Sequence, residues 1–252
     1  MNKPYQKLAV IYDEVMRHVN YHDWEDYLTR IFKSKAVSTE VILEHACGTG
    51  SLTVLLAEKG YQIVACDRSK KMIYFAQKKL PTLLKQHVKF KICSMEEFQA
   101  KKRYPVILCL YDSINYCQSQ EELIRAFQAV QKQLTPQGLF IFDVTTEVNS
   151  LRYFQNVYQV GEKPDFYYVR FSQYQSDTHL QQNHFTIFLR DKEYGYRKYQ
   201  EKHVQRIYSP EEIDKCLLES RLMIMESFDD FSFNPSHRDS ERIHYLVTHH
   251  HD

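Results

Sequence analysis

The sequence predicts an α/β protein built on a doubly wound, mostly parallel sheet, and three observations point to this fold class. Short apolar segments alternate with amphipathic segments from residue 41 to about residue 150, as in successive βαβ units. The apolar segments lack a polar face, which is typical of strands covered by helices on both sides. The chain has 252 residues, enough for one domain with an elaboration at about 100–200 residues per domain.

The N-terminal part of the chain has helical spacing, and the alternation of strands and helices begins after it. Residues 5–33 place apolar side chains on helix faces, one around Ile11 and another around Leu28. The apolar runs then predict five strands, at 41–46, 62–67, 88–93, 105–111 and 139–144. Between them helices are expected at 51–59, at 69–79, and from a capping box at Ser119 and Glu122 to about Leu134. The tetrapeptide TPQG (135–138) predicts a turn before the fifth strand.

The alternation stops at residues 151–208. DFYYVRFSQYQ, HFTIFLRD and YRKYQEKHVQRIY are rich in aromatic and β-branched residues and predict antiparallel strands, with a hairpin loop at DKEYGY. This stretch is expected to be an inserted sheet. The first pattern then resumes with a helix whose start, Ser209-Pro210-Glu211-Glu212, combines a cap with a proline at the first position. Two last strands, 222–228 and 242–249, are expected to pair at the sheet edge.

Composition excludes several classes of function. The formal net charge is +1, so no field gathers nucleic acid or an anionic membrane. No signal peptide and no apolar run near the ~20 residues of a membrane span are found, so a soluble, cytoplasmic protein is expected. The six cysteines form no metal-binding spacing and are expected to be reduced thiols. The histidines at 249–251 are either a natural tail or an expression remnant and carry no functional argument.

The stretch VILEHACGTGSLTVLLAEKG (41–60) places a glycine turn between a strand and a helix. A dinucleotide-binding turn requires a third glycine where this chain has Thr53. Asp67, at the end of the next strand, can accept two ribose hydroxyls in any nucleotide fold. Glu44 stands just before the turn, where a carboxylate would repel a pyrophosphate and attract a cation. S-adenosylmethionine carries an ammonium and a sulfonium group and no phosphate, so it fits the turn better.

On these residues the chain resembles the class I S-adenosylmethionine-dependent methyltransferases. Residues 41–79 are similar to motif I and the strand after it, although Ala46 replaces the first glycine; an alanine there is expected to need only a negative φ. CDRSKKM, CLYDSINYCQSQEEL and YQKLAVIYD look like three further family segments. The resemblance implies a Rossmann-like, seven-stranded sheet with an inserted antiparallel β lid. Residues 1–150 and 209–252 would form the cofactor-binding core, with helices in 1–35 over the cofactor, and 151–208 a substrate-binding lid.

The resemblance also implies roles for particular residues. Glu44, Ala46, Gly48 and Gly50 would line the loop under the methionine and ribose, Asp67 would bind the ribose, and Arg68, Met72, Ser94 and Met95 would surround the adenine. Leu110 and Tyr111 would face the methionine end, and Tyr5, Tyr12 and Trp24 would cover the cofactor. The family often has aspartate at the Ser94 position. The three cover aromatics and the two methionines fit an ordinary core as well, and His45 is expected to be a core histidine.

Methyl transfer is an in-line displacement, for which a protein chiefly aligns the nucleophile and excludes water. Asp112 and Asn115, in the loop after the fourth strand, are candidates to orient an amine or hydroxyl. Alternatively, Asp112 caps the next turn and Asn115 bonds backbone. The lid offers polar side chains to a substrate, or else to a dimer surface or to solvent: Tyr153, Tyr168, Arg170, His184 and Arg206.

The function expected from these features is methyl transfer from S-adenosylmethionine to nitrogen or oxygen of a small molecule. No association with a membrane is expected. A homodimer formed through the inserted sheet is left open. A regulatory S-adenosylmethionine-binding protein without catalysis is one alternative. A tRNA methyltransferase is disfavoured by the absence of a basic excess. A nicotinamide-dependent oxidoreductase is disfavoured by Glu44 and the missing third glycine.

Overall fold

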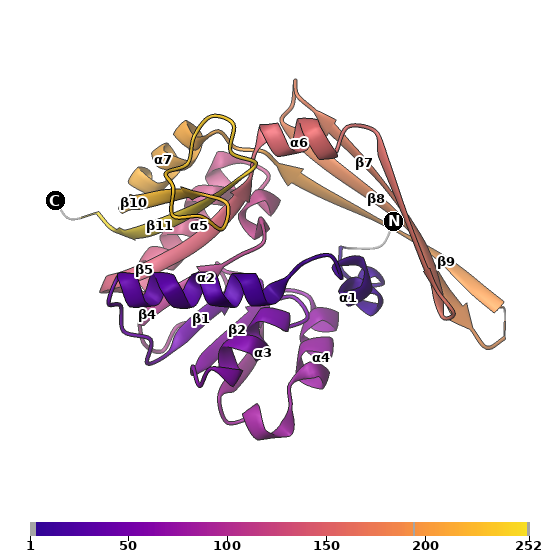
Figure 1. Ribbon diagram of the computed structural model, residues 1–252, viewed down its shortest axis with the longest axis horizontal. Helices are drawn as coiled ribbons and strands as arrows, with labels where there is room; N and C mark the ends of the chain where they lie inside the picture. The colour runs from indigo at the N-terminus through magenta and orange to yellow at the C-terminus, as the bar shows by residue number, and fades with distance from the viewer. Residues whose placement is uncertain (1–3, 194, 251–252) are drawn as a thin grey trace.

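The computed structural model describes residues 4–193 and 195–250, and it contains two sheets (Figure 1). The main sheet consists of β1 (Ile42–His45), β2 (Ile63–Asp67), β3 (Val88–Ile92), β4 (Tyr104–Cys109), β5 (Leu134–Thr145), β10 (Leu222–Asp229) and β11 (Arg242–His249). Its order is β10-β11-β5-β4-β1-β2-β3. Strands β1 to β5 are parallel, and β11 runs antiparallel to both of its neighbours. The predicted fold class and the pairing of the last two strands are confirmed.

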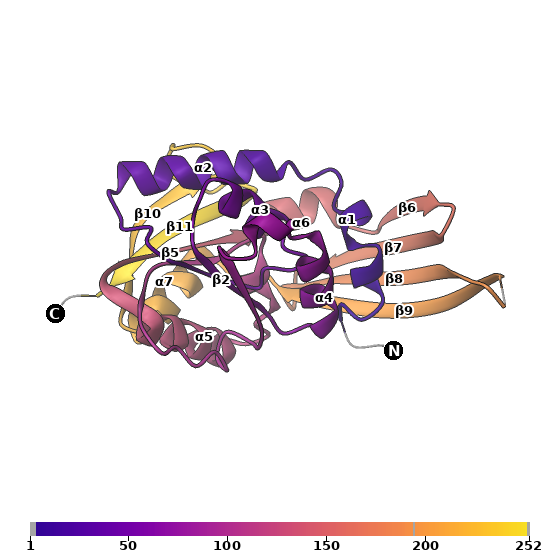
Figure 2. The same cartoon turned by 90° about the horizontal axis from the view of Figure 1, so that it is seen from below.

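Helices cover both faces of the main sheet (Figure 2). On one face lie α2 (Tyr21–Ser34) and α3 (Ser51–Glu58), with α4 (Lys70–Lys79) beside α3; on the other lie α5 (Gln120–Gln133) and α7 (Pro210–Glu219). This two-sided cover explains why the central strands such as β1 and β4 are buried on both faces, whereas the edge strand β3 alternates and is partly exposed. No helix within the described ranges has the length and apolarity needed to cross a membrane.

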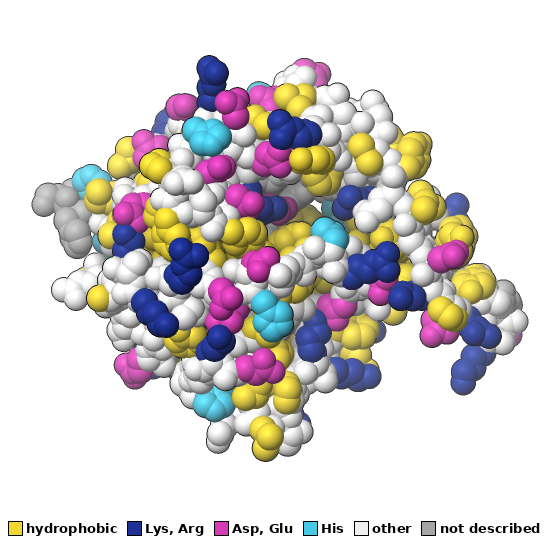
Figure 3. All heavy atoms as spheres, viewed as in Figure 1, with side chains coloured by type: hydrophobic (Ala, Val, Ile, Leu, Met, Phe, Trp, Pro, Cys, Tyr) yellow, Lys and Arg dark blue, Asp and Glu magenta, His cyan; other side chains and the backbone are white. Residues whose placement is uncertain are grey.

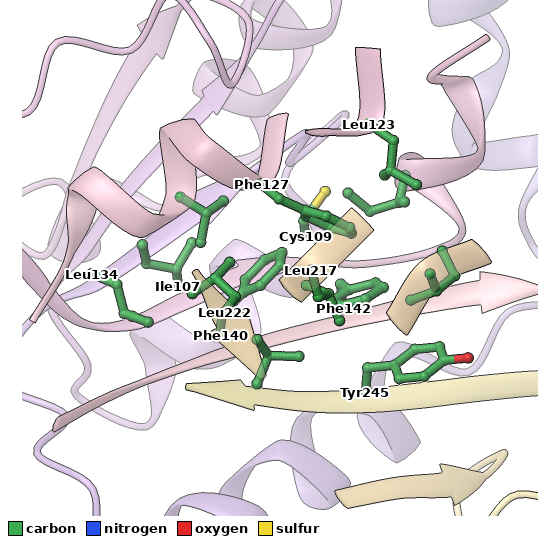
Figure 4. Close-up of a cluster of buried hydrophobic side chains, with 14 of the residues drawn as sticks. Ile107, Cys109, Leu123, Phe127, Leu134, Phe140, Phe142, Leu217, Leu222 and Tyr245 are labelled. Atoms are coloured by element: carbon green, nitrogen blue, oxygen red, sulfur yellow. The ribbon is translucent and has the colours of Figure 1, made fainter. Parts of the chain in front are cut away.

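The core beneath α5 and α7 fixes the ends of β4 and β5 (Figure 4). Phe127, Phe140 and Phe142 are fully buried, and the rings of Phe140 and Phe142 stack at 5.0 Å. Removing such a ring typically costs about 3–5 kcal/mol. The loop that follows β4 therefore begins at a tightly packed strand end.

Two local predictions need correction. Ser119 caps α5 by accepting the N–H of Glu122, but the Glu122 carboxylate accepts from Gln118 N, one residue before the cap. The segment 135–138 is not a turn between separate elements: β5 begins at Leu134, and the register with β4 jumps from Leu134 to Leu139. The extra residues form a bulge within the strand. The capping box and N1 proline of α7 are confirmed.

The N-terminal helical region is divided into three short pieces. They are η1 (Leu8–Val10), α1 (Tyr12–Val15) and α2, whose cap is Asn20. Leu8, Ile11 and Val15 pack against the second sheet and not against the main one. The N-terminal segment thus lies between the two sheets (Figure 1).

The second sheet, called the lid here, contains β6 (Val157–Lys163), β7 (Phe166–Gln175), β8 (Leu180–Asp191) and β9 (Gly195–Arg206) and follows α6 (Glu147–Tyr153). All its pairings are antiparallel, as predicted, and the β8–β9 hairpin closes where expected. β6 and α6 were not predicted. Along β7, β8 and β9 alternate side chains are buried, and those of Tyr168, Phe185 and Ile187 pack against the N-terminal segment, so the lid has an inner and an outer face.

Candidate active site

A cavity of about 370 Å³ lies at the carboxyl ends of β1, β2 and β4, under the inner face of the lid. In the space-filling view, the face of the molecule turned to the reader has a hollow near its centre, with charged side chains of both signs around it (Figure 3). Ligands of open α/β sheets bind at this end of the strands. The wall includes most of the residues singled out in the sequence: Tyr5, Tyr12, Trp24, Glu44, Ala46, Gly48, Asp67, Arg68, Met72, Ser94, Met95, Leu110, Tyr111 and Asp112. Gly50 and Asn115 are not in it.

The turn after β1 begins with a left-handed residue. Ala46 has φ +54°, so the expectation of a negative φ at this position was wrong. The chain reverses direction immediately after β1, and the glycine of the family pattern would adopt this conformation without strain. A left-handed alanine costs about 1–2 kcal/mol.

Asp67 closes the turn from the neighbouring strand. Its carboxylate accepts the N–H of Gly48 at 3.0 Å and the N–H of Ser69 at 2.7 Å. Burial raises the pKa of Asp67, and these two hydrogen bonds oppose the shift. Each carboxylate oxygen keeps a further acceptor site toward the cavity. Gly50 serves packing instead: a Cβ there would lie 3.0 Å from that of Ala76, so α3 and α4 could not approach as closely.

Glu44 is a buried carboxyl group without a cation. Its Oε2 accepts the hydroxyl hydrogen of Thr53 at 2.6 Å, and no ion pair to it is found in the described chain. Burial raises the pKa of Glu44 to about 7, although the Thr53 hydrogen bond lowers it. Thr53 therefore stands where a dinucleotide turn has glycine and binds the carboxylate instead.

These features fit S-adenosylmethionine and not a pyrophosphate. The N–H groups of Gly48 and Gly50 are already bonded, to Asp67 and to the carbonyl of Cys47. A pyrophosphate site needs such groups free, whereas an ammonium group needs the unpaired carboxylate of Glu44. His45 is a satisfied core histidine, as predicted: Nε2 lies 2.7 Å from Gln133 Oε1, and burial lowers its pKa to about 4.

The aromatic side chains predicted to cover the cofactor reach the cavity from the N-terminal segment. A Cβ on Gly48 would lie 3.9 Å from the Tyr12 ring, and Trp24 is buried with its ring centroid 6.1 Å from that of Tyr111. The carboxylate of Asp13 also connects this segment to the glycine turn and to α4. Asp13 accepts from Thr49 at 2.6 Å and from Lys79 at 2.8 Å.

Tyr5 connects the N-terminal segment to the lid. Its hydroxyl lies 2.5 Å from that of Tyr116, which lies 3.1 Å from His203 Nδ1 on β9. Glu201, two residues earlier, accepts the backbone N–H groups of Tyr5, Lys7 and Leu8. One buried carboxylate thus fastens residues 5–8 to the lid.

The predicted adenine contacts surround the other side of the turn. Met72 is buried in the first turn of α4, and the exposed Arg68 lies over the Tyr116 ring. The Ser94 hydroxyl accepts the N–H of Glu97, and the Met95 carbonyl accepts from Gln133. Ser94 thus already serves one local hydrogen bond.

Asp112 lines the cavity in a strained loop after β4. Tyr111 and Asp112 have φ of +60° and +47°. Asp112 Oδ1 accepts from Arg242 at 3.0 Å and Oδ2 accepts from Gln205, while its own N–H donates to Asp143 at 2.9 Å. Although Asp112 precedes η3 (Ser113–Tyr116), its side chain makes no capping bond, so the alternative of a cap is wrong.

Asn115 has the backbone role that was weighed as its alternative. It is fully buried, its Nδ2 donates to the Arg206 carbonyl at 2.8 Å, and its Oδ1 accepts the Thr145 N–H at 3.2 Å. This side chain joins β5 to β9 and is absent from the cavity wall. The catalytic assignment of Asn115 is therefore corrected to a structural junction between core and lid.

Several residues of the cavity wall were not identified from the sequence, among them Tyr116, His203, Gln205 and Arg242. Tyr116 lies within the resembling segment CLYDSINYCQSQEEL, which was a usable signal. The other three come from β9 and β11, and their positions in the wall depend on tertiary pairing. Of the five polar lid residues considered, Arg170 alone lines the cavity.

Comparisons with known proteins agree with this geometry. Residues 42–138 match the family described as methyltransferase domain. YqeM of Bacillus subtilis (strain 168), whose name carries a provisional methyltransferase assignment, is 29% identical over 246 residues, covering 96% of this chain and 95% of the relative.

Solved structures agree as well. An S-adenosylmethionine-dependent methyltransferase from Clostridium acetobutylicum ATCC 824 superposes with a TM-score of 0.81 at 29% identity, covering 97% of this chain and 98% of that one. The sugar N-methyltransferase KedS8 from Streptoalloteichus sp ATCC 53650 shares the fold, with a TM-score of 0.73 at 18% identity and coverage of 92% and 90%. With the fold and the turn described above, these matches support a class I S-adenosylmethionine-dependent methyltransferase, with S-adenosylmethionine as its cofactor.

Proposed function

We propose that this methyltransferase acts on a nitrogen or oxygen atom of a small-molecule acceptor bound between the core and the lid. The observation that supports this most is the position of three carboxylates, Glu44, Asp67 and Asp112, on the wall of one cavity roofed by the lid. A roofed cavity of this size suits a small ligand. The sugar N-methyltransferase named above, which shares the fold, is in keeping with a small acceptor.

In this proposal Asp67 accepts the ribose hydroxyls and Glu44 faces the ammonium group. Arg68, Met72, Ser94 and Met95 border the adenine, Leu110 and Tyr111 the methyl end, and Tyr5, Tyr12 and Trp24 exclude water from above. S-adenosylmethionine supplies a methyl group on a sulfonium, which is already a good leaving group. Asp112 then orients the acceptor and can take a proton from an ammonium or hydroxyl group. Its strained backbone, held by Arg242, Gln205 and Asp143, supports a functional role.

The test begins with calorimetry of S-adenosylhomocysteine and of NADH. Binding of the first and not of the second is expected; tight NADH binding alone would overturn the proposal. Transfer of a labelled methyl group is then measured over a panel of amines and alcohols and in a small-molecule cell extract. Failure to label any small molecule, with S-adenosylhomocysteine bound, would favour a regulatory binding protein.

The homodimer through the lid also remains a proposal. Tyr158 and Val160 on the edge strand β6 are 70% and 67% exposed, and an unpaired apolar edge can pair with a second chain. Light scattering after size exclusion should give a dimer that Val160→Lys converts to a monomer. A monomeric parent protein would contradict it.

A further inference from the structure

The polar part of the lid's inner face holds a cation that the protein leaves without a counter-charge. Arg170 on β7 lines the cavity, and within residues 4–193 and 195–250 its side chain makes no ion pair and no hydrogen bond. Its Nε is shut off from water and unpaired, and the guanidinium lies 5.5 Å from the centroid of the Phe154 ring. A buried donor left unbonded typically costs about 1–3 kcal/mol.

The neighbourhood of Arg170 supplies further amide groups that are not fully hydrogen-bonded. Gln159, directly opposite on β6, has a buried Oε1 that also lacks a partner. Asn183 faces the cavity on β8, where its Oδ1 accepts from Ser172 and its amide nitrogen has no partner among the described residues. By contrast Arg242, another half-buried arginine of the wall, is bonded to both Asp112 and Asp143. The charge of Arg170 is thus open to a ligand.

A row of hydrogen bonds fixes this part of the lid relative to Asp112. Ser150 donates to Gln181 at 2.9 Å, Gln181 donates to Gln205 at 3.1 Å, and Gln205 donates to Asp112. Arg170 belongs to the same part of the lid, because its strand β7 pairs with β8, the strand that carries Gln181. The lid arginine and the carboxylate that orients the acceptor are therefore connected through the sheet and this row of hydrogen bonds.

We propose that the methyl acceptor carries an acidic group, a carboxylate or a phosphate, and that Arg170 binds this group while Asp112 orients the atom to be methylated. The inference rests on the proposed function. A planar guanidinium can bind either acid in a bidentate manner. Glu44 and Arg170 then give the cavity two complementary unpaired charges, one for the cationic tail of the cofactor and one for the anionic acceptor.

The experiment compares the parent protein with Arg170→Gln, Arg170→Lys and Arg190→Gln, each loaded with S-adenosylhomocysteine. Arg190 is an exposed arginine of the same lid, paired with Asp165, and serves as the matched control. Inorganic phosphate and acetate are titrated separately, with chloride at equal ionic strength as the reference, and thermal stability is followed. Saturable stabilisation by at least one of the two anions is expected, and the more effective one identifies the acid.

Affinity for that anion should fall at least about tenfold in Arg170→Gln, recover in part in Arg170→Lys and stay within about twofold in Arg190→Gln. Equal anion affinity in the parent and in Arg170→Gln, or no saturable effect of either anion, would overturn the proposal. S-adenosylhomocysteine should bind all four proteins equally. Loss of that binding in the parent would instead count against the proposed function, so the two failures are distinguishable.

Discussion

The guanidinium of Arg242 donates a hydrogen bond to Asp112 at 3.0 Å across 130 residues of sequence. The same group bonds to Asp143, whose side chain is completely buried. Burial alone would lower the pKa of Arg242, but the negative charges of Asp143 and Asp112 outweigh burial and raise this pKa. Burial raises the pKa of Asp143 to about 6, and Arg242 limits this rise. One cation from β11 therefore holds the loop after β4 in its strained conformation.

Asp112→Asn should lower turnover by about 10²-fold or more, the usual effect of removing an acid–base group, while S-adenosylhomocysteine affinity changes little. The amide keeps the size of the carboxylate but cannot take a proton. Methyl transfer to an acceptor from the panel and calorimetry provide the two measurements. Asp177→Asn, in the exposed β7–β8 turn, is the control. An unchanged rate would remove Asp112 from the mechanism.

Arg242→Met should destabilise the fold by about 3–5 kcal/mol, because it leaves the buried Asp143 without its cation. Adding Asp143→Asn should restore part of this loss, so the two changes are not additive. Chemical denaturation of both single variants and the double variant gives the coupling free energy. Additive losses would show that the buried pair contributes little.

The sequence predicts the core far better than the site around Asp112. The periodic, two-sided apolar strands and the caps at Ser119 and Ser209 are local signals, and they placed most elements correctly. β6 was missed because VYQVGEK has little apolar alternation and contains a glycine. The positive φ of Ala46 was missed because a turn's dihedral angles depend on the chain reversal around it.

The contacts of the site depend on pairing between distant strands. Arg242 reaches Asp112 only because β11 lies beside β5, and Gln205 only because β9 returns from the lid. Nothing near either residue in the sequence signals this. Asp67 and Glu44 were found because the glycine turn and its two flanking strands are continuous in sequence.

Asp67→Ala should weaken S-adenosylhomocysteine binding by at least about 100-fold, since hydrogen bonds to a charged group contribute about 1.5–3 kcal/mol each. Asp67→Asn should lose less affinity, because an amide oxygen can still accept one ribose hydroxyl. Calorimetry measures both variants, and their melting temperatures report whether the turn remains folded. Retained micromolar affinity in a folded Asp67→Ala protein would refute the ribose assignment.

Glu201→Ala should release the N-terminal segment from the lid. The carboxylate accepts three backbone N–H groups. Burial alone would raise the pKa of Glu201, but the hydrogen bonds from His203 and from these N–H groups outweigh burial and lower it. Amide exchange at Lys7 and Leu8 should accelerate by about tenfold or more, as one lost charged hydrogen bond implies. Exchange in α7 is the internal reference. Unchanged protection at Leu8 would show that packing against Tyr168 and Phe185 suffices.

Glu44 should make cofactor binding depend on pH. With its pKa near 7, the carboxyl is mostly protonated at pH 6 and ionised at pH 8, and only the ionised form attracts an ammonium group. Affinity for S-adenosylhomocysteine should therefore rise through pH 6–7, by up to about tenfold per pH unit, and level off above the pKa. Stability of the unliganded protein should move the opposite way, because between pH 4.5 and 7 the folded state holds a proton that the unfolded state has released.

Two variants separate this carboxyl from other groups. Glu44→Gln should bind weakly with a flat pH profile between pH 6 and 8. Thr53→Val removes the hydrogen bond that lowers the Glu44 pKa, so it should move the midpoint of the profile to higher pH. Calorimetry over pH 5.5–8.5 in buffers of different ionisation enthalpy would also count the proton released on binding. A Glu44→Gln profile that matches the parent would assign the pH dependence to another group.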